Sequence, residues 1–265
     1  DAEDLRRRIS PFLMRRLKKE VLTELPDKIE SVFTAQMSPE QAKVYEATMM
    51  RLRQRVDSIV KEKGFERGRT EVLAAITQLR EICCHPSLVL DDYTGTSGKL
   101  DMLLDMLPEA IAKGRRVLLF SAFTSMLKIL RRELDDAGYE TMYLDGDTPA
   151  QRRVEMAEQF NAGQGQIFLI SLKAGGTGLN LTGADMVIHY DPWWNPAAED
   201  QATDRAYRIG QTRKVEVIRL VTHASIEEQV VALGQRKKAL FDQLIKPGVS
   251  MVGGLSPQEI MSLFQ

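Results

Sequence analysis

From Lys99 onward the sequence alternates between short apolar runs and amphipathic stretches, and this alternation limits the chain to few folds. The expected helices cover 99–113, 124–137 and 150–161, and the expected strands cover 117–120, 141–144, 167–170, 186–190 and 215–221. Continuous apolar strands between amphipathic helices are typical of a parallel sheet that is covered on both faces. The sequence therefore predicts an α/β fold for this part of the chain.

The preceding segment has a different pattern. A strand is expected over 29–37, after which Ser38 supplies an N-cap, Pro39 the first helical position and Gln41 a capping-box residue. Two apolar stripes at helical spacing follow: Tyr45, Met49, Leu52, Val56 and Ile59, and then Val72, Ile76, Leu79 and Cys83. We expect two helices packed as an antiparallel hairpin around a turn at 64–68.

The C-terminal end carries its own helix signals. Ser225 and Glu228 cap a last long helix, Pro247 and Gly248 break the chain, and 256–259 begins one more short helix with a capping box. The Gly, Thr and Ser residues of 93–98 mark a boundary before the α/β part. The expected division is a linker over 1–28, a strand with a helical protrusion over 29–95, a sheet-containing lobe over 96–232 and a helical extension over 233–265.

Composition narrows the functional class only modestly. The 36 Lys and Arg residues nearly balance the 37 Asp and Glu residues, so any binding of nucleic acid has to come from a local patch. The only two cysteines are adjacent, which excludes a disulfide framework and fits a reducing compartment. With no long apolar run, we expect no membrane association and a location in the cytoplasm of a bacterium or the nucleus of a eukaryote. Because the first residue is Asp1, we also expect a piece of a longer protein.

Polar loops follow the predicted strands, and ligands of parallel sheets bind at that edge. The loop over 171–180 contains three glycines, which let backbone N–H groups approach an anion such as phosphate. A dinucleotide-binding loop is a rival interpretation, because Gly176 and Gly178 supply half of that fingerprint and Asp191 ends the next strand. Leu181 and the short crossover count against it, and a plain glycine turn stays open as well.

Four polar residues after Pro196 are spaced as one stripe of a helix. Gln201, Asp204, Arg205 and Arg208 fall at i, i+3, i+4 and i+7, and two arginines one turn apart suit a phosphate. The alternative is a solvated face with an ion pair between Asp204 and Arg208.

Two further clusters admit two interpretations each. Cys83, Cys84 and His85 suggest zinc, but a structural site needs four ligands and no second pair lies near in sequence, so we expect a buried helix end and no metal site. Trp193 and Trp194 either pack internally or contact nucleotides.

The sequence lacks the phosphate loop of an ordinary ATPase. The spacing from Gly95 to Lys99 does not match G-x-x-x-x-G-K-[ST], and no Asp-Glu pair ends an apolar strand to hold magnesium. The chain has two arginines that suit a phosphate, but it lacks a phosphate-binding loop and a magnesium site. This combination indicates one half of an ATPase.

Several motifs occur together in a characteristic order. They are Val117 to Ser125 (VLLFSAFTS), Leu144 to Arg153 (LDGDTPAQRR), 171–182, Val187 to Pro196 (VIHYDPWWNP) and Gln201 to Gln211. Over about residues 115–232 this set resembles the C-terminal lobe of Swi/Snf-like DNA translocases. The flanks resemble the same family at PFLMRR (11–16) through Pro26 and at LREICCHP (79–86).

The resemblance implies a RecA-like lobe that closes on an N-terminal RecA-like lobe of the same protein. ATP with Mg²⁺ would be held mainly by that other lobe, and double-stranded DNA would run across both. By position, Arg205 and Arg208 would be arginine fingers, with Gln201 and Asp204 positioning them and water. Gly178 and Asn180 would face the nucleotide.

The family's DNA track maps, by the same resemblance, onto Ser121, Gly146, Arg153, Ser171, Lys173, Gly176 and Trp194. Contacts there would be mostly to phosphates, hence independent of sequence and sensitive to salt. The chain departs from the common pattern at Ala122, Thr177 and Tyr207, and the first puts one DNA-side hydrogen bond in question.

The expected function is therefore the C-terminal motor lobe of a DNA-stimulated ATPase and translocase, inactive without its partner lobe. Nucleoprotein and RNA polymerase are further candidate partners. A binding module outside any ATPase cycle and a dinucleotide-dependent or nucleotide-sugar enzyme are the two alternatives.

Overall fold

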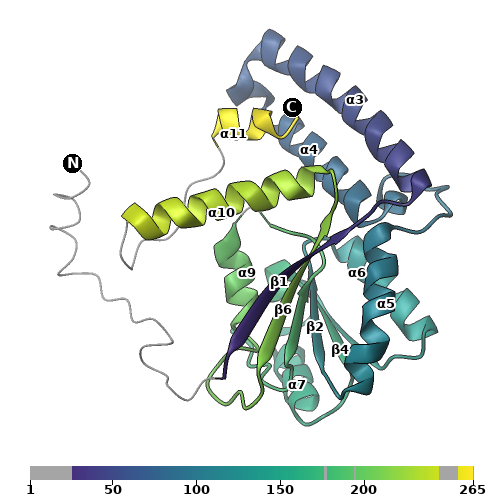
Figure 1. Cartoon of the computed structure of the whole chain (residues 1–265), viewed down its shortest axis with the longest axis vertical. Helices are drawn as coiled ribbons and strands as arrows, with labels where there is room; N and C mark the ends of the chain where they lie inside the picture. The colour runs from purple at the N-terminus through teal and green to yellow at the C-terminus, as the bar shows by residue number, and fades with distance from the viewer. Residues whose placement is uncertain (1–25, 176–177, 194, 245–255, 265) are drawn as a thin grey trace.

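The computed structural model describes residues 26–175, 178–193, 195–244 and 256–264 (Figure 1). In this part of the chain six strands form one parallel sheet in the order β1-β6-β5-β2-β4-β3. The strands are β1 (Lys28–Ala35), β2 (Val117–Ser121), β3 (Thr141–Leu144), β4 (Ile167–Ser171), β5 (Met186–His189) and β6 (Val215–Thr222). The helices are α3 (Pro39–Lys63), α4 (Phe65–Cys84), η2 (Pro86–Leu88), α5 (Gly98–Ala112), α6 (Thr124–Asp136), α7 (Ala150–Asn161), α8 (Leu172–Gly175), α9 (Pro196–Thr203), α10 (Ile226–Leu244) and α11 (Pro257–Ser262).

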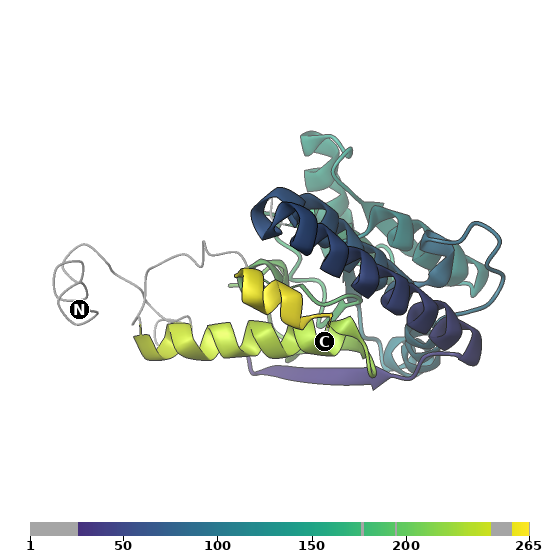
Figure 2. The ribbon, with the colours of Figure 1, turned by 90° about the horizontal axis from the view of Figure 1, so that it is seen from above.

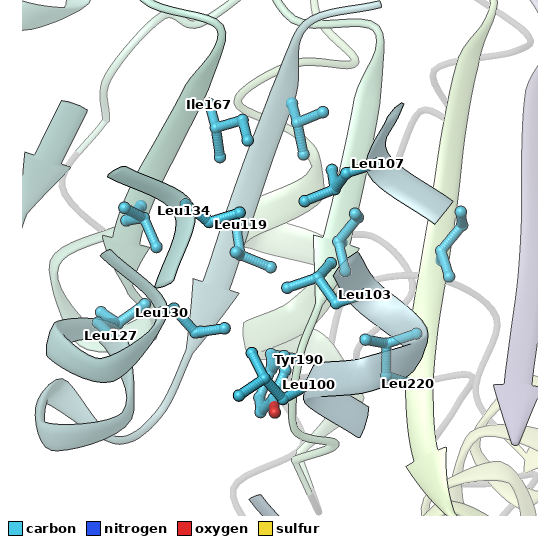
Figure 3. Packing of buried hydrophobic residues seen from close by; sticks show 14 of the residues in the cluster. Leu100, Leu103, Leu107, Leu119, Leu127, Leu130, Leu134, Ile167, Tyr190 and Leu220 are labelled. Atoms are coloured by element: carbon cyan, nitrogen blue, oxygen red, sulfur yellow. The ribbon is translucent and has the colours of Figure 1, made fainter. Parts of the chain in front are cut away.

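Helices cover both faces of the sheet, as the sequence predicts. On one face, Leu103 and Leu107 of α5 and Leu130 of α6 pack on Leu119 and Ile167 of the central strands (Figure 3). The opposite face packs against α7 and α9 through a separate cluster that includes Phe160, Phe168 and Ala202. The central strands β2 and β4 are buried at every position, which explains their uninterrupted apolar sequence.

The strand β1 belongs to the same sheet as the later strands. It pairs in parallel with β6 along its whole length, from Lys28 opposite Val215 to Ala35 opposite Thr222, and forms an edge. The boundary that we place at residue 96 therefore does not separate the sheet from everything before it. With this amendment the division into four segments remains a proposal.

The predicted hairpin forms from α3 and α4, which reverse direction at Gly64 and lie side by side (Figure 1). Gly64 has a φ of 75° and takes the place of the longer turn expected at 64–68. The Ser38 hydroxyl caps α3 by accepting from the Gln41 backbone N–H at 3.2 Å. The Gln41 side chain, however, is not in a capping box: it is buried, and its Nε2 donates to the carbonyls of Ile82 and Cys83.

The hairpin and the C-terminal helices share one apolar cluster. It contains the second predicted stripe, including Cys83, together with Val230 of α10 and Ile260 and Phe264 at α11. In Figure 2, α11 lies between α10 and the hairpin. The Ser256 capping box is present as predicted, whereas the break predicted at 247–248 lies outside the described residues. No helix in the described ranges is long and apolar enough to cross a bilayer.

Candidate functional site

The carboxyl ends of β2, β4 and β5 bring polar residues to one edge of the sheet, as parallel strands must. Ser121 at the end of β2 lies in register with Ser171 at the end of β4. Asp191 follows β5, and its carboxylate accepts from the Ser121 hydroxyl and, at 3.2 Å, from the Ala122 N–H. Buried polar contacts therefore join the loops after β2 and β5 at this edge of the sheet.

The helix that precedes the arginines is shorter than predicted. Asn195 caps α9 by accepting from the Ala197 N–H at 3.2 Å, but the helix ends at Thr203, and Asp204 is its C-cap. Arg205 and Arg208 therefore lie beyond the helix, and the prediction of one continuous helical stripe is wrong. The physical reason is tertiary: the Arg205 carbonyl accepts from the Leu181 N–H at 2.9 Å.

The two arginines differ in their surroundings. Arg205 is only 8% exposed, and its Nε has no hydrogen-bond partner in the described part of the chain. Burial, and then the charge of Arg208, lower the pKa of Arg205, while Asp204 opposes them. Arg208 is exposed, and its Nη1 lies 3.4 Å from the Gly178 carbonyl oxygen. A buried cation beside a second cation is an arrangement that an anion would stabilise.

Residues 204–208 are called the arginine segment below. Gly178 and Asn180, which the family resemblance assigns to the nucleotide, lie near it. Gly178 and Asn180 are exposed, and Gly178 has a φ of 77°, a conformation that favours glycine. The Asn180 carbonyl accepts from Asn161 Nδ2 at 2.9 Å, which fastens the loop to α7. Gln201 is exposed on α9 and Asp204 is half-buried.

The residues that the family resemblance assigns to DNA differ in their exposure. Ser121 and Ser171 are buried, and their hydroxyl oxygens accept from the N–H groups of Phe123 at 3.1 Å and Ala174 at 3.3 Å, so they stabilise turns within the lobe. Lys173 is exposed on α8.

Arg153 holds the loop after β3. It donates from Nε to the Thr148 carbonyl at 2.7 Å and from Nη2 to the Gly146 carbonyl at 2.8 Å. Gly146 itself is exposed and has open space around it. Gly176 and Trp194 lie outside the described residues.

The arginine segment fits a phosphate group of a nucleotide. The exposed guanidinium of Arg208 and the positive φ of exposed Gly178 leave a donor and close access for an anion, and buried Arg205 adds a second positive charge. Among the described residues, no group of three or more His, Cys, Asp or Glu could hold a metal ion.

Sequence reasoning missed two buried ion pairs that hold the elements around this edge of the sheet together. Arg80 of the hairpin contacts Asp191, and Lys99 of α5 contacts Glu227 of α10, in two ion pairs whose side chains are at most 1% exposed. Arg80 directly follows Leu79 of the apolar stripe, and this was the one available signal.

The six-stranded parallel sheet with helices on both faces gives the chain a RecA-like α/β fold. Residues 98–210 match the helicase conserved C-terminal domain, and residues 1–88 match the SNF2-related domain. The chain therefore belongs to the SNF2 family of helicase-like proteins, which includes the Swi/Snf ATPases.

Named relatives support this membership. The chain is 38% identical over 268 residues to the "Putative ATP-dependent helicase/translocase YwqA" of Bacillus subtilis, covering 98% of this chain and 28% of that protein. It is 37% identical over 258 residues to the chromatin structure-remodeling complex subunit snf21 of Schizosaccharomyces pombe, covering 91% and 21%. The chain thus spans about a quarter of the length of these relatives.

A solved structure shares the fold over most of the chain. The Sulfolobus solfataricus SWI2/SNF2 ATPase core in complex with double-stranded DNA is 35% identical, with a TM-score of 0.70 over 92% of this chain and 52% of that one.

Proposed function

We propose that this chain is the C-terminal motor lobe of a DNA-stimulated ATPase that translocates along double-stranded DNA. The N-terminal RecA-like lobe of the same protein would make most of the contacts to ATP and Mg²⁺. The C-terminal lobe would supply Arg205 and Arg208. The observation that carries the proposal is the pair of neighbouring arginines: Arg205 is buried, and exposed Arg208, whose charge lowers the pKa of Arg205, lies 3.4 Å from the Gly178 carbonyl oxygen. Membership in a family with ATP-dependent helicases supports it.

The chemistry of this lobe would be electrostatic. ATP supplies the phosphoryl group that is transferred to water. Arg205 and Arg208 would place positive charge on the developing phosphoryl charge when the lobes close, a contribution that reaches 10³–10⁵ in rate for arginine fingers in general. Gln201 and Asp204 would orient these arginines and water, and Gly178 and Asn180 would face the nucleotide.

The lobe would contact DNA mainly through the phosphates of the DNA backbone. Exposed Lys173 is available to a phosphate, and Arg153 holds Gly146 and Thr148 in the loop that would face the same strand. The complex of the Sulfolobus solfataricus relative with double-stranded DNA supports this assignment. We therefore expect binding that is independent of sequence and weakens steeply with salt.

The decisive experiment compares arginine variants in the protein that joins this chain to its N-terminal lobe. We expect Arg205→Ala and Arg208→Ala each to lower the DNA-stimulated kcat by about 10³ or more, with ATP affinity changed less than about threefold. The matched control is Arg131→Ala, which removes an exposed arginine of α6 that pairs with Asp135. Wild-type turnover by both variants would refute the finger assignment. A two-lobed protein that binds DNA without any hydrolysis would favour the binding-module alternative.

A further inference from the structure

One arginine of the helical hairpin is buried against the loop that follows β5. Arg80 of α4 is 1% exposed, and its Nη2 lies 3.2 Å from Asp191 Oδ2 and 2.9 Å from the Pro192 carbonyl oxygen. Its guanidinium carbon also lies 4.8 Å from the ring centroid of Trp193 and 5.1 Å from that of Phe123. A single side chain of the hairpin therefore contacts the loops after β2 and β5.

The carboxylate of Asp191 is the centre of these contacts. Besides Arg80, it accepts from the Ser121 hydroxyl and from the Ala122 N–H, whose nitrogen is 3.2 Å from each carboxylate oxygen. Asp191 is itself only 3% exposed. Removal of Arg80 would leave this buried negative charge without its cation, which is strongly unfavourable in proteins. The orientation of both loops thus depends on Arg80.

The sheet side holds the same loop by a separate ion pair. The Trp193 N–H donates to Glu199 Oε1 at 2.8 Å, and Glu199 Oε2 lies 2.7 Å from Arg219 Nε of β6. Asn195 then caps α9, which leads to the arginine segment. The loop from Asp191 to Trp193 is therefore fixed between the hairpin and the sheet, and a shift of α4 relative to the sheet has to be transmitted to it.

We propose that Arg80 is the positioning residue through which the helical hairpin sets the geometry of the loop from Asp191 to Trp193, and so the DNA affinity of this lobe. The second part rests on the proposed function. Replacing both members of a buried ion pair by apolar side chains often gives equal or greater stability, so stability alone does not require the pair of Arg80 and Asp191. The forked guanidinium instead fixes the direction of Asp191 and Pro192 while it stacks on Trp193. A ligand that displaced the hairpin would change DNA binding without touching DNA.

The first measurement needs neither DNA nor nucleotide. In the protein with both lobes, hydrogen exchange of the peptide containing Trp193 is compared with that of peptides from β2 and β4. We expect Arg80→Met to speed exchange at Asp191 and Trp193 at least tenfold and to leave the central strands protected. The matched control is Arg69→Met, an exposed arginine of the same helix, which should leave both rates unchanged. Equal rates in wild type and Arg80→Met would overturn the positioning role.

The second measurement is the duplex DNA concentration that gives half-maximal ATPase stimulation. We expect Arg80→Met to raise it at least fivefold while the DNA-free ATPase rate stays within twofold of wild type. Arg80→Lys keeps the charge without the fork, so we expect a smaller rise. If Arg80→Met does not fold, Arg80→Lys and the double variant Arg80→Met with Asp191→Asn supply the same comparisons.

The double variant tests whether the effect passes through Asp191. Because Asp191→Asn removes the charge that Arg80 neutralises, we expect its addition to Arg80→Met to restore part of the slow exchange and of the DNA affinity. Additive effects would overturn the route through Asp191. Faster exchange with an unchanged DNA requirement would overturn the link to DNA, whereas a wild type without DNA stimulation would refute the proposed function and leave the exchange result standing.

Discussion

The buried ion pair between α5 and α10 permits a quantitative test of how the lobe is held together. Lys99 Nζ lies 2.7 Å from Glu227 Oε1, and both side chains are 0% exposed. Lys99 also donates to the Tyr190 carbonyl at 2.9 Å, and Glu227 Oε2 accepts from the Thr222 N–H at 2.9 Å. The pair therefore connects the start of α5, the end of β5 and the start of α10.

Glu227→Gln keeps the shape of the side chain and removes one acceptor and the charge. Its single carbonyl oxygen cannot replace both carboxylate oxygens, so either Lys99 or the Thr222 N–H loses its acceptor. Breaking one partner of a buried pair typically costs about 3–5 kcal/mol. At about 2–4 °C per kcal/mol for a chain of this size, Tm should fall by roughly 6–20 °C.

Urea unfolding followed by circular dichroism measures this free energy. Glu228→Gln is the matched control: it changes the neighbouring glutamate, whose partner is the exposed His223, and should cost less than about 1 kcal/mol. Adding Lys99→Met to Glu227→Gln removes the unpaired cation, so the double variant should be more stable than the sum of the single effects by about 2 kcal/mol. A loss below about 1 kcal/mol in Glu227→Gln, or strict additivity, would refute the reasoning.

Two further predictions follow from buried groups. Burial lowers the pKa of His189 from 6.5 to about 3. Below pH 6.5 the unfolded chain therefore takes up a proton at this residue, whereas the folded chain does not. The contribution of His189 to the free energy of unfolding is fully present above pH 6.5 and falls by about 1.4 kcal/mol per pH unit below it, toward pH 3. Urea unfolding at pH 7.5 and 5.5 should show a larger loss in wild type than in His189→Phe, which keeps the smaller contribution of His85, whose pKa burial also lowers; equal losses would contradict the assignment. A Cβ on Gly98 would lie 1.7 Å from the Gln36 carbonyl oxygen, so Gly98→Ala should lose at least about 2 kcal/mol. Gly146→Ala, with open space around it, should lose less than about 1 kcal/mol, and similar values for the two would be evidence against that close contact.

Local periodicity was sufficient to predict most of the elements. The strands β2 and β4 are apolar up to their final serine because both faces are covered, and β3 lies at the predicted residues 141–144. The place of β1 in the sheet was not predictable in this way. It pairs with β6, which follows it by more than 170 residues, and the pattern of a strand does not specify its partner.

The candidate site was predictable as a set of loops but not as a set of contacts. The parallel sheet implies that Ser121, Ser171 and Asp191 meet at one edge, and they do. The Ser121 hydroxyl contacts the same carboxylate, that of Asp191, as Arg80, which comes from the helical hairpin outside the α/β alternation. A charged residue directly after a residue of an apolar stripe, as Arg80 is after Leu79, is the local sign of such a contact.

The arginine segment shows most directly how tertiary bonds override local helical preference. Residues 197–208 contain neither Gly nor Pro, so the pattern predicts a helix through Arg208, yet α9 ends at Thr203. Beyond it, the Arg205 carbonyl is bonded to the Leu181 N–H, and Gln211 Nε2 donates to the carbonyls of Thr182 at 3.2 Å and Ala184 at 2.7 Å. The arginines are thus fixed to the segment that follows the glycine loop rather than to the axis of α9. In the proposed composite site, both sides of the phosphate-facing surface would therefore move together when the lobes close.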